Sequence, residues 1–200
     1  MRGVSKVVTP TRRAGRGVVV SKSGLVLPFT KEFGLHSLQK RCQELAHAIH
    51  LHYLGRQVDE IALVGILEGG TYFATLLSLE MSFPHRLHLL YPPGINGEWS
   101  YDLNRIRSRE IVLVDDVCDS GATLHHMRRW LLGNGRRVTL CVMADKQISK
   151  LEPDWVGFNV PSRWLFGLGM DLEDGRLRNM PFVGSLDLPE DEARKILGVE

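Results

Sequence analysis

Three carboxylates and a run of small residues follow a short apolar segment in the middle of the chain. Residues 111–123 read IVLVDDVCDSGAT, so Asp115 and Asp116 come directly after four apolar residues and Asp119 lies three positions further on. Carboxylates accept hydrogen bonds from hydroxyl groups or coordinate divalent cations. The Ser-Gly-Ala-Thr that follows offers hydroxyl donors and a glycine that lets the backbone approach an anion. Paired acids beside an anion-binding loop are suited to a phosphorylated sugar.

The elements that must position these residues follow from hydrophobic periodicity. The spacing of apolar residues predicts helices over 38–54, 70–81, 122–132 and 189–197. Short apolar runs predict strands at 61–66, 86–91, 111–114 and 137–143. This alternation indicates an α/β fold with a mostly parallel sheet flanked by helices, and the short extended segments after residue 154 indicate a small, hood-like C-terminal part.

Ligands of such sheets bind beyond the carboxyl ends of the strands, where the loops meet the helix N-termini. The acidic motif occupies that position, and the backbone N–H groups of residues 119–123 are expected to face outward at the start of a helix. Neither the G-x-x-x-x-G-K-[ST] phosphate loop nor a G-x-G-x-x-G after the first strand is present. The motif therefore predicts a phosphate site of a different kind.

Composition narrows the class of protein. The 200 residues are 44% hydrophobic with a net charge of +2, which suits one well-cored domain and gives no reason to expect nucleic acid or membrane as a partner. Three widely spaced cysteines predict a reducing, cytoplasmic location. Residues 1–31 are basic and contain no acidic residue, so they are expected to form an extension before a domain at 32–200. A transit peptide or an anion-binding arm are the alternatives.

The motif itself resembles the phosphoribosyl pyrophosphate motif of type I phosphoribosyltransferases. That motif is a hydrophobic strand, two acids, two mostly apolar residues, an acid, Ser or Thr, Gly, any residue, and Thr. Two further stretches are similar to one branch of the family. GILEGGTYFATLL resembles the pyrophosphate loop, and ADK followed by DWVGFNVPSRWLFGLGMD resembles the purine-binding end of hypoxanthine-guanine phosphoribosyltransferases.

The resemblance implies roles for individual residues. Asp115 and Asp116 would hold the ribose hydroxyls, directly or through Mg²⁺, and Asp119 would accept the proton of purine N7 as the glycosidic bond forms. The 5-phosphate is expected to bind to the loop residues Ser120, Gly121, Ala122 and Thr123, and pyrophosphate to Glu68, Gly69, Gly70 and Arg178.

The purine is expected to contact three residues near the C-terminus. Lys146 would donate a hydrogen bond to the 6-oxo group, Trp164 would stack on the base, and Leu165 would offer backbone groups to its edge. Asp171 is similar to the carboxylate that holds a second Mg²⁺, so the expected metal ligands are Asp115, Asp116 and Asp171.

Two positions depart from the family pattern. Relatives commonly have Lys, Arg or an uncharged residue where this chain has Glu68, and a carboxylate beside pyrophosphate is repulsive. The mobile loop usually begins with Ser/Thr-Tyr or Arg-Tyr, whereas this chain has Leu90-Tyr91 followed by PPGINGEW. Tyr91 can keep part of the closing role.

The resemblance therefore implies a purine salvage enzyme. It would transfer the phosphoribosyl group of phosphoribosyl pyrophosphate to hypoxanthine or guanine, giving a nucleoside monophosphate and pyrophosphate. The reaction would use Mg²⁺, and the enzyme would be a homodimer or homotetramer. Two alternatives stay open from the sequence. The chain can be a non-catalytic regulator that binds phosphoribosyl pyrophosphate or nucleotide, or a transferase of another base such as xanthine.

Overall fold

The computed structural model describes residues 15–92 and 102–199. The chain divides into two compact units, which we name by their parts in the fold. The core unit is His36–Val160, and the hood unit combines the segment up to Leu35 with the segment from Pro161 to the C-terminus. Each unit has its own β-sheet.

The core unit has a five-stranded sheet in the order β4-β3-β5-β6-β7, with every neighbouring pair parallel. Its strands are β3 (Ile61–Ile66), β4 (His85–Leu90), β5 (Glu110–Cys118), β6 (Arg137–Asp145) and β7 (Trp155–Asn159). The helices are α1 (Leu35–Leu54), α2 (Gly70–Glu80) and α3 (Ala122–Gly133), with a 3-10 turn at Leu103–Arg105. The predicted parallel sheet flanked by helices is confirmed.

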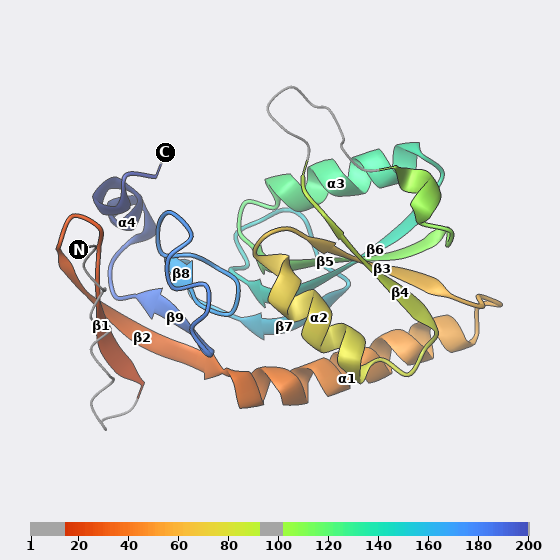
Figure 1. Cartoon of the computed structure of the whole chain (residues 1–200), viewed down its shortest axis with the longest axis horizontal. Coiled ribbons are helices and arrows are strands. Elements are labelled where there is room, and N and C mark those ends of the chain that lie inside the picture. The colour runs from red at the N-terminus through yellow and green to blue at the C-terminus, as the bar shows by residue number, and fades with distance from the viewer. Residues whose placement is uncertain (1–14, 93–101, 200) are drawn as a thin grey trace, which may run out of the picture. The chain divides into compact units, whose positions relative to one another are not determined.

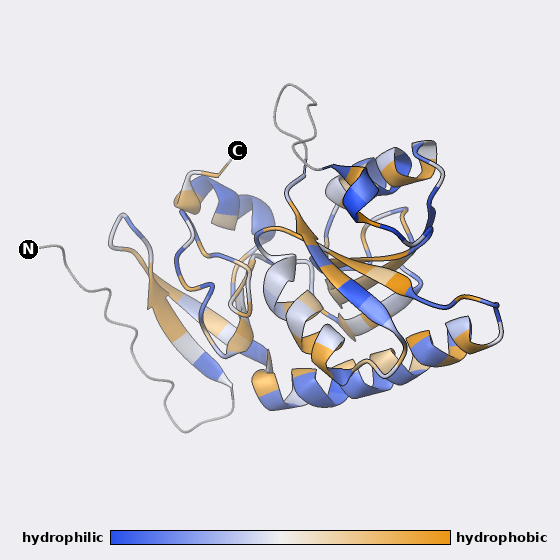
Figure 2. Ribbon diagram, turned by 45° about the vertical axis from the view of Figure 1, so that its right-hand side comes forward, coloured by the Kyte–Doolittle hydropathy of each residue, from blue (hydrophilic) through white to orange (hydrophobic). Residues whose placement is uncertain are grey.

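Helices cover both faces of this sheet, which is why its central strands contain continuous apolar runs. Figure 1 shows α3 on one face and α1 and α2 on the other, and Figure 2 shows apolar residues concentrated on the strands between them. All six residues of β3 are buried. Parallel strands covered on both faces have continuous apolar runs rather than alternation.

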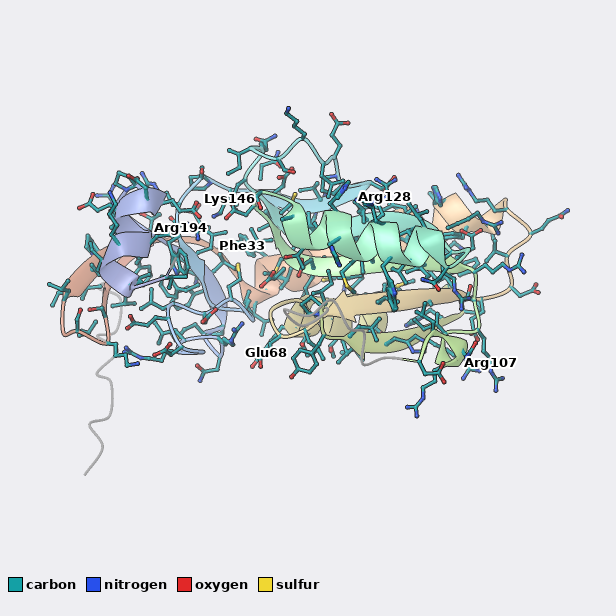
Figure 3. The ribbon with its side chains drawn as sticks, turned by 90° about the horizontal axis from the view of Figure 1, so that it is seen from above. Phe33, Glu68, Arg107, Arg128, Lys146 and Arg194 are labelled. Atoms are coloured by element: carbon teal, nitrogen blue, oxygen red, sulfur yellow. The ribbon has the colours of Figure 1, made fainter. Side chains whose placement is uncertain are left out.

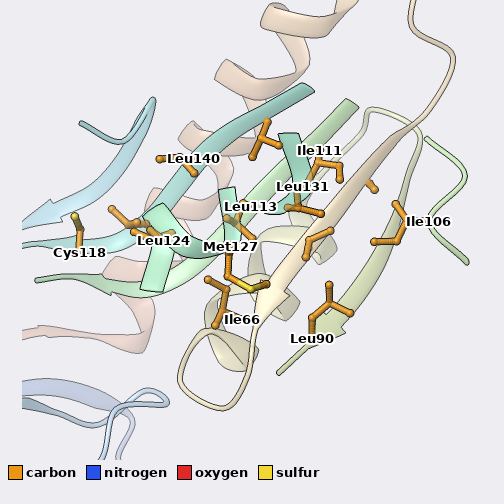
Figure 4. Close-up of a cluster of buried hydrophobic side chains, with 14 residues drawn as sticks. Ile66, Leu90, Ile106, Ile111, Leu113, Cys118, Leu124, Met127, Leu131 and Leu140 are labelled. Carbon is orange, nitrogen blue, oxygen red and sulfur yellow. The ribbon is translucent and has the colours of Figure 1, made fainter. Parts of the chain in front are cut away.

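The face under α3 contains a cluster of buried side chains that fixes this helix on the sheet (Figure 4). Leu124, Met127 and Leu131 lie at helical spacing and are almost fully buried against strand residues such as Leu113 and Leu140. Burying each such side chain contributes about 1.5–3 kcal/mol. The cluster therefore sets the position of the loop that joins β5 to α3.

The hood unit has a four-stranded antiparallel sheet in the order β1-β2-β9-β8. Its elements are β1 (Arg16–Val20), β2 (Val26–Gly34), β8 (Leu165–Phe166), β9 (Phe182–Leu186) and helix α4 (Glu190–Leu197). A second hydrophobic cluster joins this sheet to α4 and contains Phe29, Phe166, Phe182, Ala193 and Leu197.

The N-terminal half of the hood corrects one expectation. Residues 16–34 form a hairpin of β1 and β2, and β2 pairs with β9, so the end of the expected extension at residue 31 lies inside a strand. Apolar residues of the hairpin, including Val19, Leu27 and Phe29, are buried in the hood cluster. The first fourteen residues of the expected extension lie outside the described residues.

Candidate active site

A pocket of about 360 Å³ lies in the core unit at the carboxyl ends of β3 and β5. It is lined by the residues Ile66, Leu67, Gly69, Pro92, Asp115, Asp116, Val117, Asp119, Ser120, Gly121, Ala122, Thr123 and Leu124. The structure therefore brings together the paired acids, the whole predicted phosphate loop and one glycine of the predicted pyrophosphate loop.

The phosphate loop connects the end of β5 to the first turn of α3. Gly121 is the N-cap of α3 and has a φ of 76°, a left-handed conformation that favours glycine. A Cβ atom at this position would lie 2.4 Å from Oγ of Ser149, so a side chain is excluded sterically as well. The N–H groups of the first helical turn have no partner within the helix and attract anions. The loop has the geometry of a phosphate site.

Ser149 is hydrogen-bonded to this loop and was not identified from the sequence. Its hydroxyl donates a hydrogen bond to the carbonyl oxygen of Ser120 at 3.0 Å and accepts one from the N–H of Leu151 at 2.9 Å. A serine in a loop gives no periodic or motif signal, because its partner lies twenty-nine residues away. The contact links the segment after β6 to the phosphate loop.

Asp115 and Asp116 occupy the last part of β5 with different exposures. The side chain of Asp115 is buried and its Oδ1 accepts a hydrogen bond from the N–H of Asp116 at 2.9 Å. Oδ1 of Asp116 accepts a hydrogen bond from the N–H of Val117 at 2.7 Å. Burial, and then the neighbouring charge of Asp116, raise the pKa of Asp115 well above its ordinary value. Hydroxyl donors or a cation would relieve this repulsion.

The loop after β3 approaches the acids closely. A Cβ atom at Gly69 would lie 1.8 Å from Oδ2 of Asp116, and one at Gly70 would lie 3.1 Å from the carbonyl oxygen of Val114. The peptide bond between Leu67 and Glu68 is cis. Leu67 and Gly69 line the pocket, while the side chain of Glu68 is exposed at the same end of the core unit as Lys146 (Figure 3). Glycine at position 69 is therefore a steric requirement.

Asp119 and Lys146 form an ion pair at this end of the sheet. Nζ of Lys146 donates a hydrogen bond to Oδ2 of Asp119 at 3.1 Å. The two residues are brought together because β5 and β6 are parallel neighbours, and the N–H of Lys146 donates to the carbonyl oxygen of Cys118 at 3.1 Å. Asp119 lines the pocket, so the predicted proton acceptor and the predicted purine donor lie side by side.

The hood unit contains the other predicted purine residues. Leu165 is the first residue of β8 and Trp164 directly precedes it. The carbonyl oxygen of Trp164 accepts a hydrogen bond from the N–H of Leu186 at 2.9 Å. The guanidinium of Arg194 lies 5.5 Å from the centre of the Trp164 ring, within the range of a cation–π interaction. The indole is also packed against the hood cluster. Helix α4 thus holds the ring of Trp164.

Asp171 and Arg178, both predicted from the resemblance, also lie together in the hood unit. Nη2 of Arg178 is 3.2 Å from Oδ1 of Asp171, and Oδ2 of Asp171 accepts a hydrogen bond from the N–H of Gly175 at 3.0 Å. These two contacts close the loop from Asp171 to Arg178. No group of three or more metal-binding side chains occurs among the described residues.

Tyr91 follows β4 and is 58% exposed. The expected mobile loop begins there, and its residues 93–101 lie outside the described residues. No helix in the described part of the chain has the length and apolar character needed to cross a membrane.

A parallel sheet with paired acids and a phosphate loop at the carboxyl end of its central strand is the arrangement expected of a phosphoribosyltransferase. Residues 34–172 match the phosphoribosyl transferase domain family. The hypoxanthine phosphoribosyltransferase of Salmonella typhimurium is 30% identical over 175 residues, which cover 76% of this chain and 97% of the relative. That of Haemophilus influenzae is 26% identical over 168 residues, or 78% and 93% of the two chains. The chain belongs to the hypoxanthine phosphoribosyltransferase family.

Two solved structures have a similar fold. A hypoxanthine-guanine phosphoribosyltransferase from Bacillus anthracis has a TM-score of 0.68 and 25% identity, and the match covers 78% of this chain and 96% of that one. The Trypanosoma cruzi hypoxanthine phosphoribosyltransferase in complex with the product IMP has a TM-score of 0.69 and 20% identity, covering 78% and 92%. The similarity to the Trypanosoma cruzi structure shows that the two proteins share a fold.

Proposed function

We propose that this chain transfers the 5-phosphoribosyl group of phosphoribosyl pyrophosphate to N9 of hypoxanthine or guanine, giving IMP or GMP and pyrophosphate. The proposal rests on one observation above all. The pocket that contains the paired acids and the phosphate loop also contains Asp119, and Asp119 is hydrogen-bonded to Lys146. A phosphate site, a proton acceptor and a hydrogen-bond donor for a 6-oxo group are thus adjacent.

The proposed reaction breaks the bond between C1′ and the pyrophosphate oxygen and forms a bond from C1′ to N9. The electron pair of the broken bond leaves with pyrophosphate, and Asp119 accepts the proton from N7 of the base. The N-terminal turn of α3 holds the 5-phosphate. Trp164 and Leu165 would contact the base, and Gly69, Gly70 and Arg178 would contact pyrophosphate. Positioning and electrostatics supply the catalysis.

We also propose Mg²⁺ as the cofactor, with one ion held by Asp115 and Asp116 and a second ion held by Asp171, each together with substrate oxygens. The fit is supported by the raised pKa of Asp115, caused by burial and then by Asp116, because an added cation would offset that charge. Mg²⁺ is usually bound through one or two carboxylates plus phosphates, so two adjacent acids suffice. When bound, it supplies neutralisation of the charge on the leaving pyrophosphate.

A regulator that binds but does not transfer is the second candidate, and Glu68 is the residue that favours it. A carboxylate 4 Å from a phosphate charge in water costs about 1 kcal/mol. The side chain of Glu68 is exposed and is not part of the pocket lining, so it should weaken pyrophosphate binding without abolishing it. The geometry therefore supports the enzyme more than the regulator.

We further propose a homodimer or homotetramer and a cytoplasmic location. Tyr72 and Leu79 are exposed apolar residues of α2, which supports association with a second copy. Cys42, Cys118 and Cys141 are buried and unbridged, as expected of a protein in a reducing compartment. Light scattering on the purified chain tests the proposed oligomeric state.

A phosphoribosyl transfer assay tests the function. The chain, Mg²⁺ and phosphoribosyl pyrophosphate would be offered hypoxanthine, guanine, xanthine or adenine in turn. We expect much faster turnover of the 6-oxopurines than of adenine, and a loss of about 100-fold or more in kcat for Asp119→Asn. Asp59→Asn, at an exposed position, is the matched control. Binding of phosphoribosyl pyrophosphate without turnover of any base would favour the regulator.

A further inference from the structure

A buried carboxylate lies in the loop between Asp171 and Arg178. Glu173 is only 4% exposed, although the loop is at the surface of the hood unit. Its Oε1 accepts hydrogen bonds from Nη1 of Arg176 at 2.6 Å and from the N–H of Lys22. Burying a carboxylate is costly unless it is paired and hydrogen-bonded, so Glu173 organises the groups around it.

These contacts join the loop to the hairpin of β1 and β2. Nη2 of Arg176 donates a hydrogen bond to the carbonyl oxygen of Val20 at 3.0 Å, and the ammonium of Lys22 pairs with Asp174. Val20 is the last residue of β1, and both hairpin residues precede residue 34, where the match to the transferase domain begins. The connection therefore attaches a segment outside the matched region to a loop with two predicted site residues.

Hydrogen bonds within the loop connect Glu173 and Arg176 to the predicted site residues Asp171 and Arg178. The N–H of Arg176 donates to the carbonyl oxygen of Glu173, and the N–H of Leu172 donates to that of Arg176, both at 2.9 Å. Asp171 is held within the same turn by the N–H of Gly175 and by Arg178. A shift of Glu173 or Arg176 would therefore move both ends of the loop.

We propose that Glu173 is a positioning residue that fixes Asp171 and Arg178, through Arg176 and the hairpin, in the geometry that receives the pyrophosphate end of phosphoribosyl pyrophosphate. The inference rests on the proposed function. It gives residues 16–34 a role in substrate binding. A loop that is ordered before the substrate arrives avoids the entropy cost of ordering it on binding.

Glu173→Gln tests the proposal because glutamine keeps the shape and an oxygen for the N–H of Lys22 but removes the charge that holds Arg176. We expect the KM and the calorimetric Kd for phosphoribosyl pyrophosphate to rise about tenfold and the KM for hypoxanthine to change less than about twofold. Hydrogen exchange of the amides at 172–178 should become faster. Arg176→Lys tests the same link from the other side.

The matched control is Lys22→Met. It removes an ion pair whose side chains are 72% and 64% exposed, but it keeps the backbone N–H that contacts Glu173. Exposed pairs contribute about 0–1 kcal/mol, so this variant should bind phosphoribosyl pyrophosphate within about threefold of wild type.

The possible results distinguish a failure of this inference from a failure of the proposed function. A lower melting temperature for both Glu173→Gln and Arg176→Lys, with unchanged binding of phosphoribosyl pyrophosphate and an active wild type, would show a purely structural role and overturn the inference alone. Failure of the wild-type chain to bind phosphoribosyl pyrophosphate would refute the proposed function and this inference together.

Discussion

The ammonium group of Lys146 donates a hydrogen bond to Oδ2 of Asp119 at 3.1 Å, and the lysine side chain is 4% exposed whereas that of the aspartate is 28% exposed. The buried cation is thus satisfied by a carboxylate that lines the pocket. Because the two groups follow neighbouring parallel strands, their separation is set by the sheet itself. A base that binds beside Asp119 also comes within reach of Lys146.

The first prediction concerns base selection. Lys146→Met should lower kcat/KM for hypoxanthine by about 100-fold, since a buried donor to the 6-oxo group is lost, and should lower that for adenine much less. The ratio of the two kcat/KM values measures the effect directly. Lys150→Met, an exposed position in the same loop, serves as the control. An unchanged ratio would show that Lys146 does not select the base.

The second prediction concerns the close approach of the loop after β3. Gly69→Ala should lower kcat/KM for phosphoribosyl pyrophosphate by about 100-fold, because the added methyl group would displace Asp116 and a displacement of about 1 Å is enough for such a loss. The contact it would meet lies at 1.8 Å. Gly133→Ala in α3, with no atom within 4 Å of the added Cβ, should leave activity unchanged. Steady-state kinetics on both variants provide the comparison.

The third prediction follows from the raised pKa of Asp115, which is caused by burial and then by Asp116. Between about pH 3.9 and this raised pKa, Asp115 is protonated in the folded chain but ionised in the unfolded chain. Stability therefore falls as the pH rises from that value through the raised pKa of Asp115, and the full cost remains at higher pH. Asn cannot titrate, so Asp115→Asn removes this slope.

Urea denaturation in EDTA, without substrate, measures this effect. The stability advantage of Asp115→Asn over wild type should be absent near pH 3.5, grow with pH, and be largest above the raised pKa. Binding of phosphoribosyl pyrophosphate should be weaker in the same variant. Equal midpoints for the two proteins at pH 8 would contradict the prediction.

The elements of the core unit were predicted because each one is marked by a run of adjacent residues in the sequence. Four apolar residues before Asp115 identify β5, and the motif that follows identifies the phosphate loop. Short extended segments after residue 154 were predicted, but the hood sheet was not, because β2 pairs with β9 across 157 residues in the pair Phe29–Leu186. Pairing at that distance depends on the packed cluster and not on neighbouring residues. The N-terminal hairpin was therefore interpreted as an extension.

The same reason explains which site residues escaped sequence reasoning. Ser149, Glu173 and Arg194 act on predicted residues through contacts that only the fold creates. Asp119 and Lys146 were predicted, but their mutual hydrogen bond was not, because it depends on the order of β5 and β6 in the sheet. Sequence motifs thus predicted the groups that we propose to contact substrate, and the structure added the side chains that hold those groups in place.

Arg194 provides the last prediction, since its guanidinium lies 5.5 Å from the centre of the Trp164 ring and also donates to Glu190 at 3.1 Å. A cation over an indole contributes about 0.5–1 kcal/mol at a partly exposed site. Arg194→Met keeps the aliphatic packing on the ring but removes this attraction. The orientation of Trp164 should become less well defined.

We therefore expect Arg194→Met to raise the KM for hypoxanthine about two- to fivefold, in proportion to the lost interaction, and to leave the KM for phosphoribosyl pyrophosphate unchanged. Lys195→Met, at an exposed position one residue further along α4, controls for the loss of a positive charge. Equal effects of the two variants would assign the change to net charge. An effect of Arg194→Met alone, on the purine alone, would identify α4 as the support of the stacking residue.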